Sequence, residues 1–229
     1  MYIAGLSLPF SPTQCVEGIV SLATAQFFFT TFKKMAAVKA VAEAEGGAVR
    51  PQTMPTSFLA KIISPIHGLA FFLPPLAYMI GVACNGFHQP QWMLNFSLPD
   101  DVVSTHGKVA LRGLACFIGL GFAKIMESGV KHLGDQWHVI GRREKPRIVQ
   151  TGPYAILRHP MYSLVLVQEV LFSVMFWSYI PLYALAITAG AFAIKMPIEE
   201  NIIQGDASVA AEYREYKKKV PSRVIPYVW

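Results

Sequence analysis

Five long apolar runs constrain the fold of this chain more than any other feature. They cover Cys15–Phe32, Ile62–Ala83, Val109–Met126, Leu164–Tyr179 and Pro181–Met196. Runs of about 20 residues match the length that a helix needs to cross the hydrocarbon layer of a bilayer. Only 15% of the 229 residues are charged, whereas soluble domains carry about 25%. The sequence therefore predicts an all-α polytopic membrane protein with about five transmembrane helices.

Three local signals add detail to this prediction. The last two runs are short and separated only around "WSYIP", which predicts a C-terminal helical hairpin. Pro65, Pro74 and Pro75 are expected to kink or break the second span. The segment Glu43–Ser57 is rich in Gly, Pro and small polar residues, which is typical of a mobile loop.

The distribution of basic residues predicts the orientation in the membrane. The net charge is +6, and Lys and Arg gather in the loop after the first run and in the segment after the third. The loop after the second run, "NGFHQPQWMLNFSLPDD", has none. The positive-inside rule then places the N-terminus outside and the C-terminus in the cytoplasm, although Lys108 and Arg112 do not fit this pattern. Because the charges are split among several loops, nucleic-acid binding is the weaker interpretation.

Two carboxylates fall inside apolar runs, Glu17 in the first and Glu169 in the fourth. A charge at membrane depth is costly, so such a group usually faces the bundle interior or a wet cavity. For Glu17, a position near the interface is an equal alternative. The three cysteines lie far apart without a CxxC pair, so neither a metal site nor a redox pair is indicated. We expect His67 to be a packing residue.

The last third of the chain carries the groups suited to chemistry. "GPYAILRHPMYS" precedes the predicted hairpin, and the adjacent carboxylates Glu199 and Glu200 follow it. Because a hairpin returns the chain to the same membrane face, His159 and Glu199 are expected to meet in a cytoplasmic pocket. Aromatic faces and carboxylates favour a sulfonium or ammonium group, and cations favour a carboxylate. An ordinary interfacial belt of Tyr, Lys and Arg is the competing interpretation.

These motifs resemble the isoprenylcysteine carboxyl methyltransferases, part of a wider group of membrane methyltransferases that includes the phospholipid methyltransferases. The resemblance is carried by "GPYAILRHPMY", the downstream "EE" and the ending "EYREYKKKVPSRVIP", within about residues 136–226. It implies a division into N-terminal transmembrane helices and loops, residues 1–135, and a catalytic methyltransferase region, residues 136–229. It also implies a multi-pass location in the endoplasmic reticulum membrane with the catalytic face in the cytoplasm.

The resemblance implies S-adenosyl-L-methionine as cofactor and assigns its contacts. They are Pro146, Arg147, Ile148, Val149, Tyr154, His159, Pro160, Met161, Tyr162 and Glu199. Gly141 falls where the family often has a polar contact. The family arginine credited with the substrate carboxylate falls on Lys195, which makes Lys195 and Glu199 the implied catalytic residues.

Three features depart from the family pattern or disturb it. Lys195 lacks the bidentate fork of an arginine. Leu164 stands where the family usually has Gly, and its larger side chain is expected to narrow the space for a close approach of a helix or of the cofactor. Pro197 lies between Lys195 and Glu199 and is expected to weaken their placement on one helix face.

The implied activity is methyl transfer to the C-terminal carboxylate of prenylated cysteine, in prenylated protein C-termini or small prenylcysteine substrates. One alternative is a phospholipid or other lipid amine N-methyltransferase, for which Glu169 or Glu200 would be the required base. Two others are a sterol-reductase-like protein that uses a nicotinamide cofactor and a non-catalytic membrane scaffold.

Overall fold

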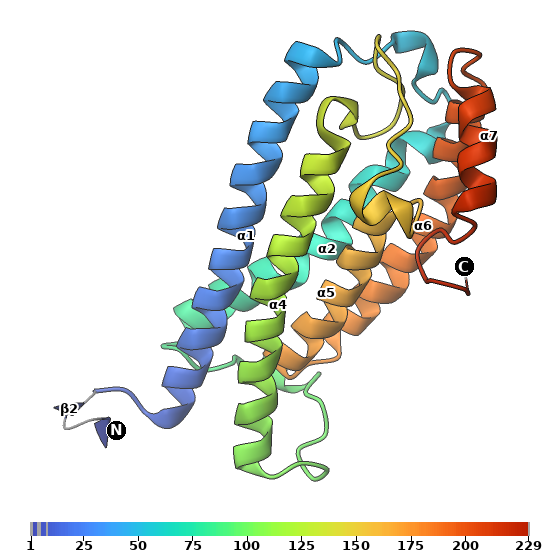
Figure 1. Cartoon of the computed structure of the whole chain (residues 1–229). Coiled ribbons are helices and arrows are strands. Elements are labelled where there is room, and N and C mark those ends of the chain that lie inside the picture. Colours follow the sequence, from blue (N-terminus) through green and yellow to red (C-terminus); the bar gives the residue numbers. More distant parts are fainter. Residues whose placement is uncertain (1, 4–5, 8, 229) are drawn as a thin grey trace.

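The computed structural model describes residues 2–3, 6–7 and 9–228 of the chain. Five long helices form a bundle (Figure 1): α1 (Pro12–Glu45), α2 (Phe58–Cys84), α4 (Thr105–Leu133), α5 (Pro160–Phe176) and α6 (Ile180–Gln204). The shorter elements are α3 (Gln91–Leu94), α7 (Ala210–Lys219) and an antiparallel pair of two-residue strands, β1 (Tyr2–Ile3) and β2 (Leu6–Ser7). The bundle therefore confirms the predicted all-α fold.

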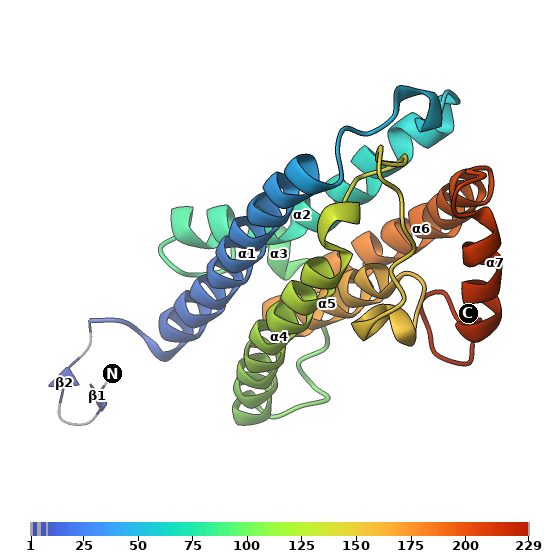
Figure 2. The same ribbon diagram turned by 45° about the horizontal axis from the view of Figure 1, so that its top comes forward.

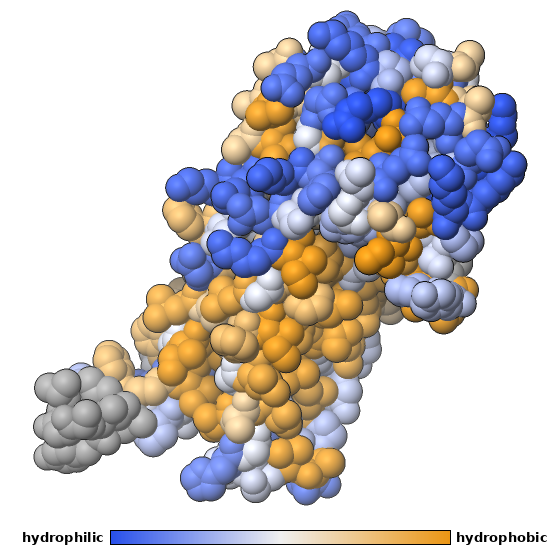
Figure 3. Space-filling model, in the orientation of Figure 1, coloured by the Kyte–Doolittle hydropathy of each residue, from blue (hydrophilic) through white to orange (hydrophobic). Residues whose placement is uncertain are grey.

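Four of the long helices, α1, α2, α4 and α6, are long and apolar enough to cross a membrane, and α5 is a shorter apolar helix. Large apolar side chains stay exposed on their outer faces, including Leu22, Leu69 and Phe117 at 72%, 63% and 76% exposure. A space-filling view shows a broad apolar band below a polar end (Figure 3). An apolar band of this kind is suited to lipid rather than water. The chain is thus a multi-pass membrane protein.

Local sequence signals set where the long helices begin. Ser11 caps α1 through a capping box with Gln14, and Pro12 occupies the first helical position. Ser57 and Ser104 cap α2 and α4, each accepting a backbone N–H three residues later. The hydroxyl groups stabilise N–H groups that would otherwise lack partners at a helix start.

Two helices continue further than the sequence indicates. α2 runs unbroken from Phe58 to Cys84 with all three prolines inside it, so the break that these prolines could have caused is absent, because neighbouring helices in a bundle support a proline-containing helix. α1 continues past the predicted end at Phe32 as far as Glu45. In this polar extension, Lys34 Nζ lies 2.6 Å from Glu127 Oε1 on α4, so α4 supports the part of α1 that the apolar pattern does not cover.

The loop between α1 and α2, which the sequence predicts to be mobile, makes backbone contacts with Arg143 and Glu144. Val49 pairs with Arg143 in an antiparallel bridge, and Glu144 N donates to Ala48 O at 3.0 Å. Gly46 permits this approach, since a Cβ there would lie 2.1 Å from Asp135 O. The partners are almost 100 residues downstream in the chain, so no local signal could reveal them.

The C-terminal hairpin forms as predicted, with its turn between α5 and α6. Trp177 ends α5 in the left-handed region at φ +54°. The α3–α4 loop fastens the turn, because Tyr179 N donates to Phe96 O at 2.8 Å and Leu98 N donates to Trp177 O at 3.1 Å. The hairpin consequently brings the start of α5 and the end of α6 to the same end of the bundle.

Glu17 is buried in the bundle interior and is paired. Arg112 of α4 reaches it with two hydrogen bonds of 2.8 and 2.9 Å, and Tyr78 of α2 donates to the same carboxylate. Gln89 Nε2 links the group to α5 through Phe176 O at 2.9 Å. Pairing with Glu17 also explains how Arg112 is tolerated inside a span.

The polar segments gather at the other end of the bundle. The loop after α1, the segment between α4 and α5 (residues 134–159) and α7 lie together there, far from the N-terminal strands (Figures 1 and 2). We call residues 134–159 the α4–α5 segment. This end holds the main cavity of the described residues.

Candidate functional site

A cavity of about 400 Å³ opens at the polar end of the bundle. Its walls come from α1, α2, α4, the α4–α5 segment, the start of α5, the end of α6 and α7. A volume of this size lies within the range of small-molecule sites, about 300–1,000 Å³. Helices from residues 1–135 therefore contribute walls beside the proposed catalytic region, residues 136–229.

One side of the cavity is apolar and lies among the membrane helices. Met35 of α1, Phe71 and Phe72 of α2, and Met126 and Val130 of α4 line it. His67 also lies on this wall, where its Nδ1 is 3.1 Å from Ile63 O and its ring packs against Phe192 at 5.0 Å between centroids. The carbonyl can only accept, so Nδ1–H is the donor. This surface suits an extended hydrocarbon group.

An aromatic stack separates the apolar side from the charged groups. The Tyr162 ring lies parallel to Phe192, with centroids 4.1 Å apart, and parallel to His159 at 5.3 Å. The phenol of Tyr162 donates to Glu199 Oε1 at 2.7 Å. A single tyrosine therefore connects an apolar surface to a partly buried carboxylate.

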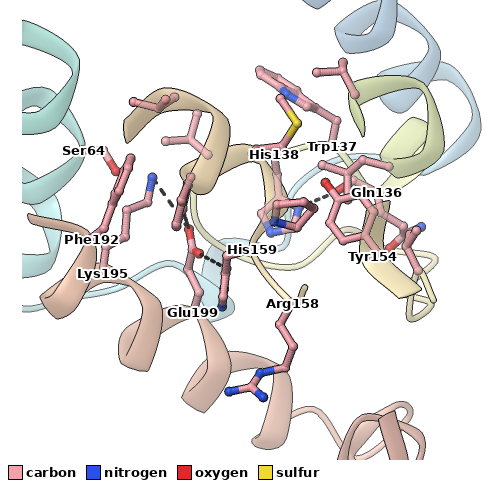
Figure 4. A pocket seen from close by; sticks show the side chains of 18 of the residues that line it. Ser64, Gln136, Trp137, His138, Tyr154, Arg158, His159, Phe192, Lys195 and Glu199 are labelled. Carbon is pink, nitrogen blue, oxygen red and sulfur yellow. Dashed lines mark hydrogen bonds and ion pairs between the residues drawn. The ribbon is translucent and has the colours of Figure 1, made fainter. Parts of the chain in front are cut away.

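Lys195 and Glu199 form the charged centre of the cavity. Lys195 Nζ lies 3.7 Å from Glu199 Oε1 and 5.3 Å from the centre of the Tyr162 ring. His159 Nδ1 lies 3.7 Å from Glu199 Oε2 on the other side. Figure 4 shows the three side chains converging, whereas Arg158 points away from them. The cluster offers an ammonium, a carboxylate and aromatic faces within one small volume.

Pro197 does not disturb this geometry, which corrects the expectation from the sequence. α6 continues through Pro197 to Gln204, and Lys195 and Glu199 remain paired one turn apart. Leu164 does not narrow the cavity either. It packs in the main apolar core with Met126 and Phe172 and is absent from the cavity walls within the described residues.

Glu200 faces away from the cavity and binds a cluster of cations. Arg158 Nε lies 3.0 Å from its Oε1, Arg223 reaches both oxygens at 3.2 Å, and Lys217 Nζ lies 3.5 Å away. The ring of His159 also approaches it at 3.4 Å through Nε2. The two adjacent carboxylates therefore have different surroundings, Glu199 in the cavity and Glu200 in a structural ion cluster.

The C-terminal residues cover the element "RHP". Arg158 N donates to Ser222 O at 3.1 Å, and His159 N donates to Arg223 O at 2.9 Å. Ser163 Oγ donates to Val224 O at 2.6 Å. We call residues 220–224 the C-terminal strap. It fixes His159 at the start of α5, one residue before Pro160 opens the helix.

The α4–α5 segment forms the remaining polar wall. The side chain of Gln136 links the two ends of a loop in this segment, since Nε2 donates to Lys145 O at 3.0 Å and Oε1 accepts from Arg147 N at 3.1 Å. His138 Nδ1 donates to Gln136 O at 2.5 Å, and burial lowers the pKa of His138 to about 4. The ring of His138 is thus neutral near pH 7, with Nε2 as an acceptor.

Tyr154 completes this wall, and its backbone is held by a residue of α7. Tyr216 of α7 donates its hydroxyl to Tyr154 O at 2.7 Å. Burial raises the pKa of the Tyr154 phenol, which therefore stays protonated and can donate a hydrogen bond. α7 serves as a support for the cavity rather than only as its outer wall.

Of the ten cofactor contacts expected from the sequence, all except Pro146 line the cavity. Their binding role stays a prediction. Lys195 and Gly141 lie on the walls too, whereas Glu169 is absent from them within the described residues and accepts from Thr188 Oγ1 at 2.8 Å. Sequence reasoning missed Gln136, Trp137, His138 and Arg142. A Trp-His pair before a basic cluster is the one available signal, and it does not indicate a cavity.

The fold and the cavity define a polytopic membrane protein with a mixed apolar and charged site at one end of its helical bundle. Residues 114–204 match the sequence model of the isoprenylcysteine carboxyl methyltransferase family. The chain is also 28% identical to protein-S-isoprenylcysteine O-methyltransferase B of Arabidopsis thaliana over 169 residues, which are 73% of this chain and 77% of that protein. The two matches confirm the resemblance to this family of methyltransferases.

Proposed function

We propose that this protein transfers a methyl group from S-adenosyl-L-methionine to the C-terminal carboxylate of a prenylated cysteine. The observation that carries the proposal is the composition of the cavity. A hydrocarbon-lined side among the membrane helices meets a charged centre of Lys195 and Glu199. A prenylcysteine has the same division, an apolar chain joined to a carboxylate.

The residues at the polar end fit the proposed cofactor. S-adenosyl-L-methionine, when bound, supplies an electrophilic methyl group on a positively charged sulfur. The partly buried carboxylate of Glu199 and the aromatic faces of Tyr162 and His159 favour a cation of this kind. Arg147, Ile148, Val149 and Tyr154 line the adjacent wall, where an adenosine group would lie between apolar and hydrogen-bonding surfaces.

Lys195 is proposed to orient the substrate carboxylate. Its ammonium lies at the boundary between the aromatic stack and Glu199, with its side chain only 5% exposed. A carboxylate is ionised near pH 7, so attack on a methyl group needs no general base. The protein then accelerates the reaction by aligning the two reactants and excluding water. Lys195 provides a point charge in place of a bidentate fork.

The prenyl chain is proposed to enter sideways from the bilayer. The apolar wall is formed by α1, α2 and α4, the same helices that carry exposed apolar side chains on their outer faces, and Figure 3 shows the broad apolar band of the molecule's surface. Entry from the membrane keeps the hydrocarbon out of water, where each buried CH2 group is worth about 0.8 kcal/mol.

The proposed location is the endoplasmic reticulum membrane, with the cavity on the cytoplasmic face. The basic residues of the loop after α1 and of the α4–α5 segment lie at the cavity end of the bundle. Their position supports this orientation under the positive-inside rule.

The contacts of two carboxylates weigh against the lipid amine alternative. Transfer to an ammonium substrate first requires removal of a proton. Glu169 is turned toward Thr188 and Glu200 is occupied by Arg158 and Arg223, so neither candidate base faces the cavity.

The test is transfer of labelled methyl from S-adenosyl-L-methionine to N-acetyl-S-farnesylcysteine by membranes that contain this protein. We expect incorporation with this substrate and none with its methyl ester or with N-acetylcysteine. Incorporation into lipid alone would identify an amine methyltransferase. Binding of NADPH without binding of S-adenosylhomocysteine would indicate a reductase-like protein, and cofactor binding without transfer to any acceptor would indicate a scaffold.

A further inference from the structure

Arg142 is a buried cation on the cavity wall that the proposed mechanism does not use. It lines the cavity and is 3% exposed. The loop between α1 and α2 fixes its backbone, because Arg142 N donates to Thr53 Oγ1 at 2.8 Å and Arg142 O accepts from Arg50 N at 2.8 Å. Both the N–H and the carbonyl group of Arg142 are therefore held by this loop.

The guanidinium of Arg142 has few of its hydrogen bonds filled. Nη2 makes one long contact, 3.4 Å, with Arg147 O, and Nε has no partner among the described residues. The nearest carboxylate, Asp206, lies 3.9 Å from Nε. That carboxylate already accepts from Arg50 Nη2 and Ser208 Oγ, so it neutralises Arg142 only in part.

Three other arginines near the cavity differ from Arg142, because their guanidinium groups have close partners. Arg147 binds Asp135 at 2.5 Å, and Arg158 binds Glu200 at 3.0 Å. Arg143, adjacent in sequence and equally buried, donates to the carbonyl groups of Trp137 and Gly47 at 2.8 and 2.6 Å. Arg143 is absent from the cavity walls within the described residues. Of these two neighbouring arginines, Arg143 thus has a structural role and Arg142 lies on the cavity wall.

A buried guanidinium with unfilled donors costs free energy unless an anion pairs with it. Its planar fork matches a carboxylate. We propose that Arg142 forms a carboxylate subsite of this cavity, distinct from Lys195. The inference rests on the proposed function, in which two carboxylates enter the cavity, one on the amino-acid tail of the cofactor and one on the substrate.

The cofactor carboxylate is the favoured occupant. Arg142 contacts the main chain of Arg147, within the segment proposed to hold the cofactor, whereas Lys195 is assigned to the substrate. With Glu199 near the sulfonium and Arg142 at the carboxylate, the two charges of the cofactor would be met by separate residues.

The test compares ligands that differ by this one group, using purified full-length protein in detergent or nanodiscs and isothermal titration calorimetry. Wild-type protein is expected to bind S-adenosylhomocysteine roughly 10- to 100-fold more tightly than its decarboxylated analogue. Arg142→Gln should abolish that preference, and Arg142→Lys should keep part of it. Arg143→Gln is the matched control and should leave the preference unchanged.

A second arm distinguishes the two sources of carboxylate. If Arg142→Gln instead removes the preference for N-acetyl-S-farnesylcysteine over its methyl ester, the subsite is confirmed but serves the substrate. Two results together overturn the subsite alone. Wild-type protein binds S-adenosylhomocysteine and its decarboxylated analogue equally, and Arg142→Gln keeps the wild-type preference for N-acetyl-S-farnesylcysteine over its methyl ester. Wild-type protein that binds none of these ligands overturns the proposed function together with it.

Discussion

Arg112 and Glu17 form a two-point ion pair inside the helical bundle, with N–O distances of 2.8 and 2.9 Å. Arg112 Nε also donates to Met175 O at 2.7 Å, so the pair joins α1, α4 and α5. The cavity lies at the opposite, polar end of these helices. The ion pair therefore belongs to the framework of the bundle and not to the site.

The first prediction separates the two halves of this ion pair. Glu17→Ala leaves a buried guanidinium without its partner and should lower stability by about 3–5 kcal/mol. The double variant Glu17→Leu with Arg112→Met should recover most of the loss, because no buried charge remains. Thermal unfolding in detergent measures both. Asp100→Ala, which breaks an exposed pair with Lys108, is the control and should cost under about 1 kcal/mol. Equal losses in the single and double variants would contradict the prediction.

The second prediction concerns Lys195 in methyl transfer. Lys195→Met removes the charge proposed to orient the substrate carboxylate and should reduce kcat/KM by about 10-fold or more. Lys195→Arg keeps a cation and should retain much of the activity. Steady-state transfer to N-acetyl-S-farnesylcysteine provides the measurement. Lys124→Met, an exposed lysine of α4, controls for loss of charge, and unchanged turnover in Lys195→Met would remove this lysine from the mechanism.

The third prediction assigns Glu200 to the C-terminal strap. Glu200→Ala removes the anchor of Arg223 and Arg158, so the strap should open more often. Limited trypsin digestion should then cleave after Arg223 about 10-fold faster than in wild-type protein. Glu215→Ala breaks an exposed pair with Lys218 on the same side of the molecule and should leave the cleavage rate unchanged. A strap that stays protected in Glu200→Ala would mean that its backbone hydrogen bonds suffice.

The fourth prediction follows from the lowered pKa of His138, about 4 against 6.5 in an unfolded chain. Between these values the unfolded chain takes up a proton and the folded chain does not, so stability falls as the pH drops from 6.5 toward 4. The loss reaches about 3 kcal/mol at the lower limit. In His138→Asn, the midpoint temperature of unfolding should change less with pH over this range than it does in wild-type protein. His88→Asn, at an exposed turn, should keep the wild-type slope, and an unchanged slope in His138→Asn would assign the effect to another group.

Much of the bundle could be predicted because apolar composition reports directly on membrane burial. The hairpin turn at Trp177–Tyr179 and the meeting of His159 with Glu199 both follow from that pattern. The polar half of α1 could not be predicted in this way, because Lys34 is stabilised by Glu127 of another helix. The contacts of the loop after α1 could not be predicted for the same reason, since Val49 pairs with Arg143 far along the chain.

The sequence motifs predicted several residues of the candidate site, but the residues around them were missed. "RHPMY" and "EE" mark the positions of His159, Tyr162 and Glu199, but two adjacent glutamates look equivalent in a sequence. Only the fold separates Glu199, beside Tyr162, from Glu200, which Arg223 of the strap holds. Arg142 and Arg143 are likewise indistinguishable until their carbonyl partners are known.

The C-terminal strap has a consequence for biosynthesis. His159 is fixed by Arg223 O and Ser163 by Val224 O, so residues translated more than 60 positions later complete the wall of the cavity. All five long helices precede the strap in the chain and can enter the membrane before it leaves the ribosome. The helices of the bundle are thus synthesised before the strap, and the wall at His159 is completed only after residues 220–224 have been translated.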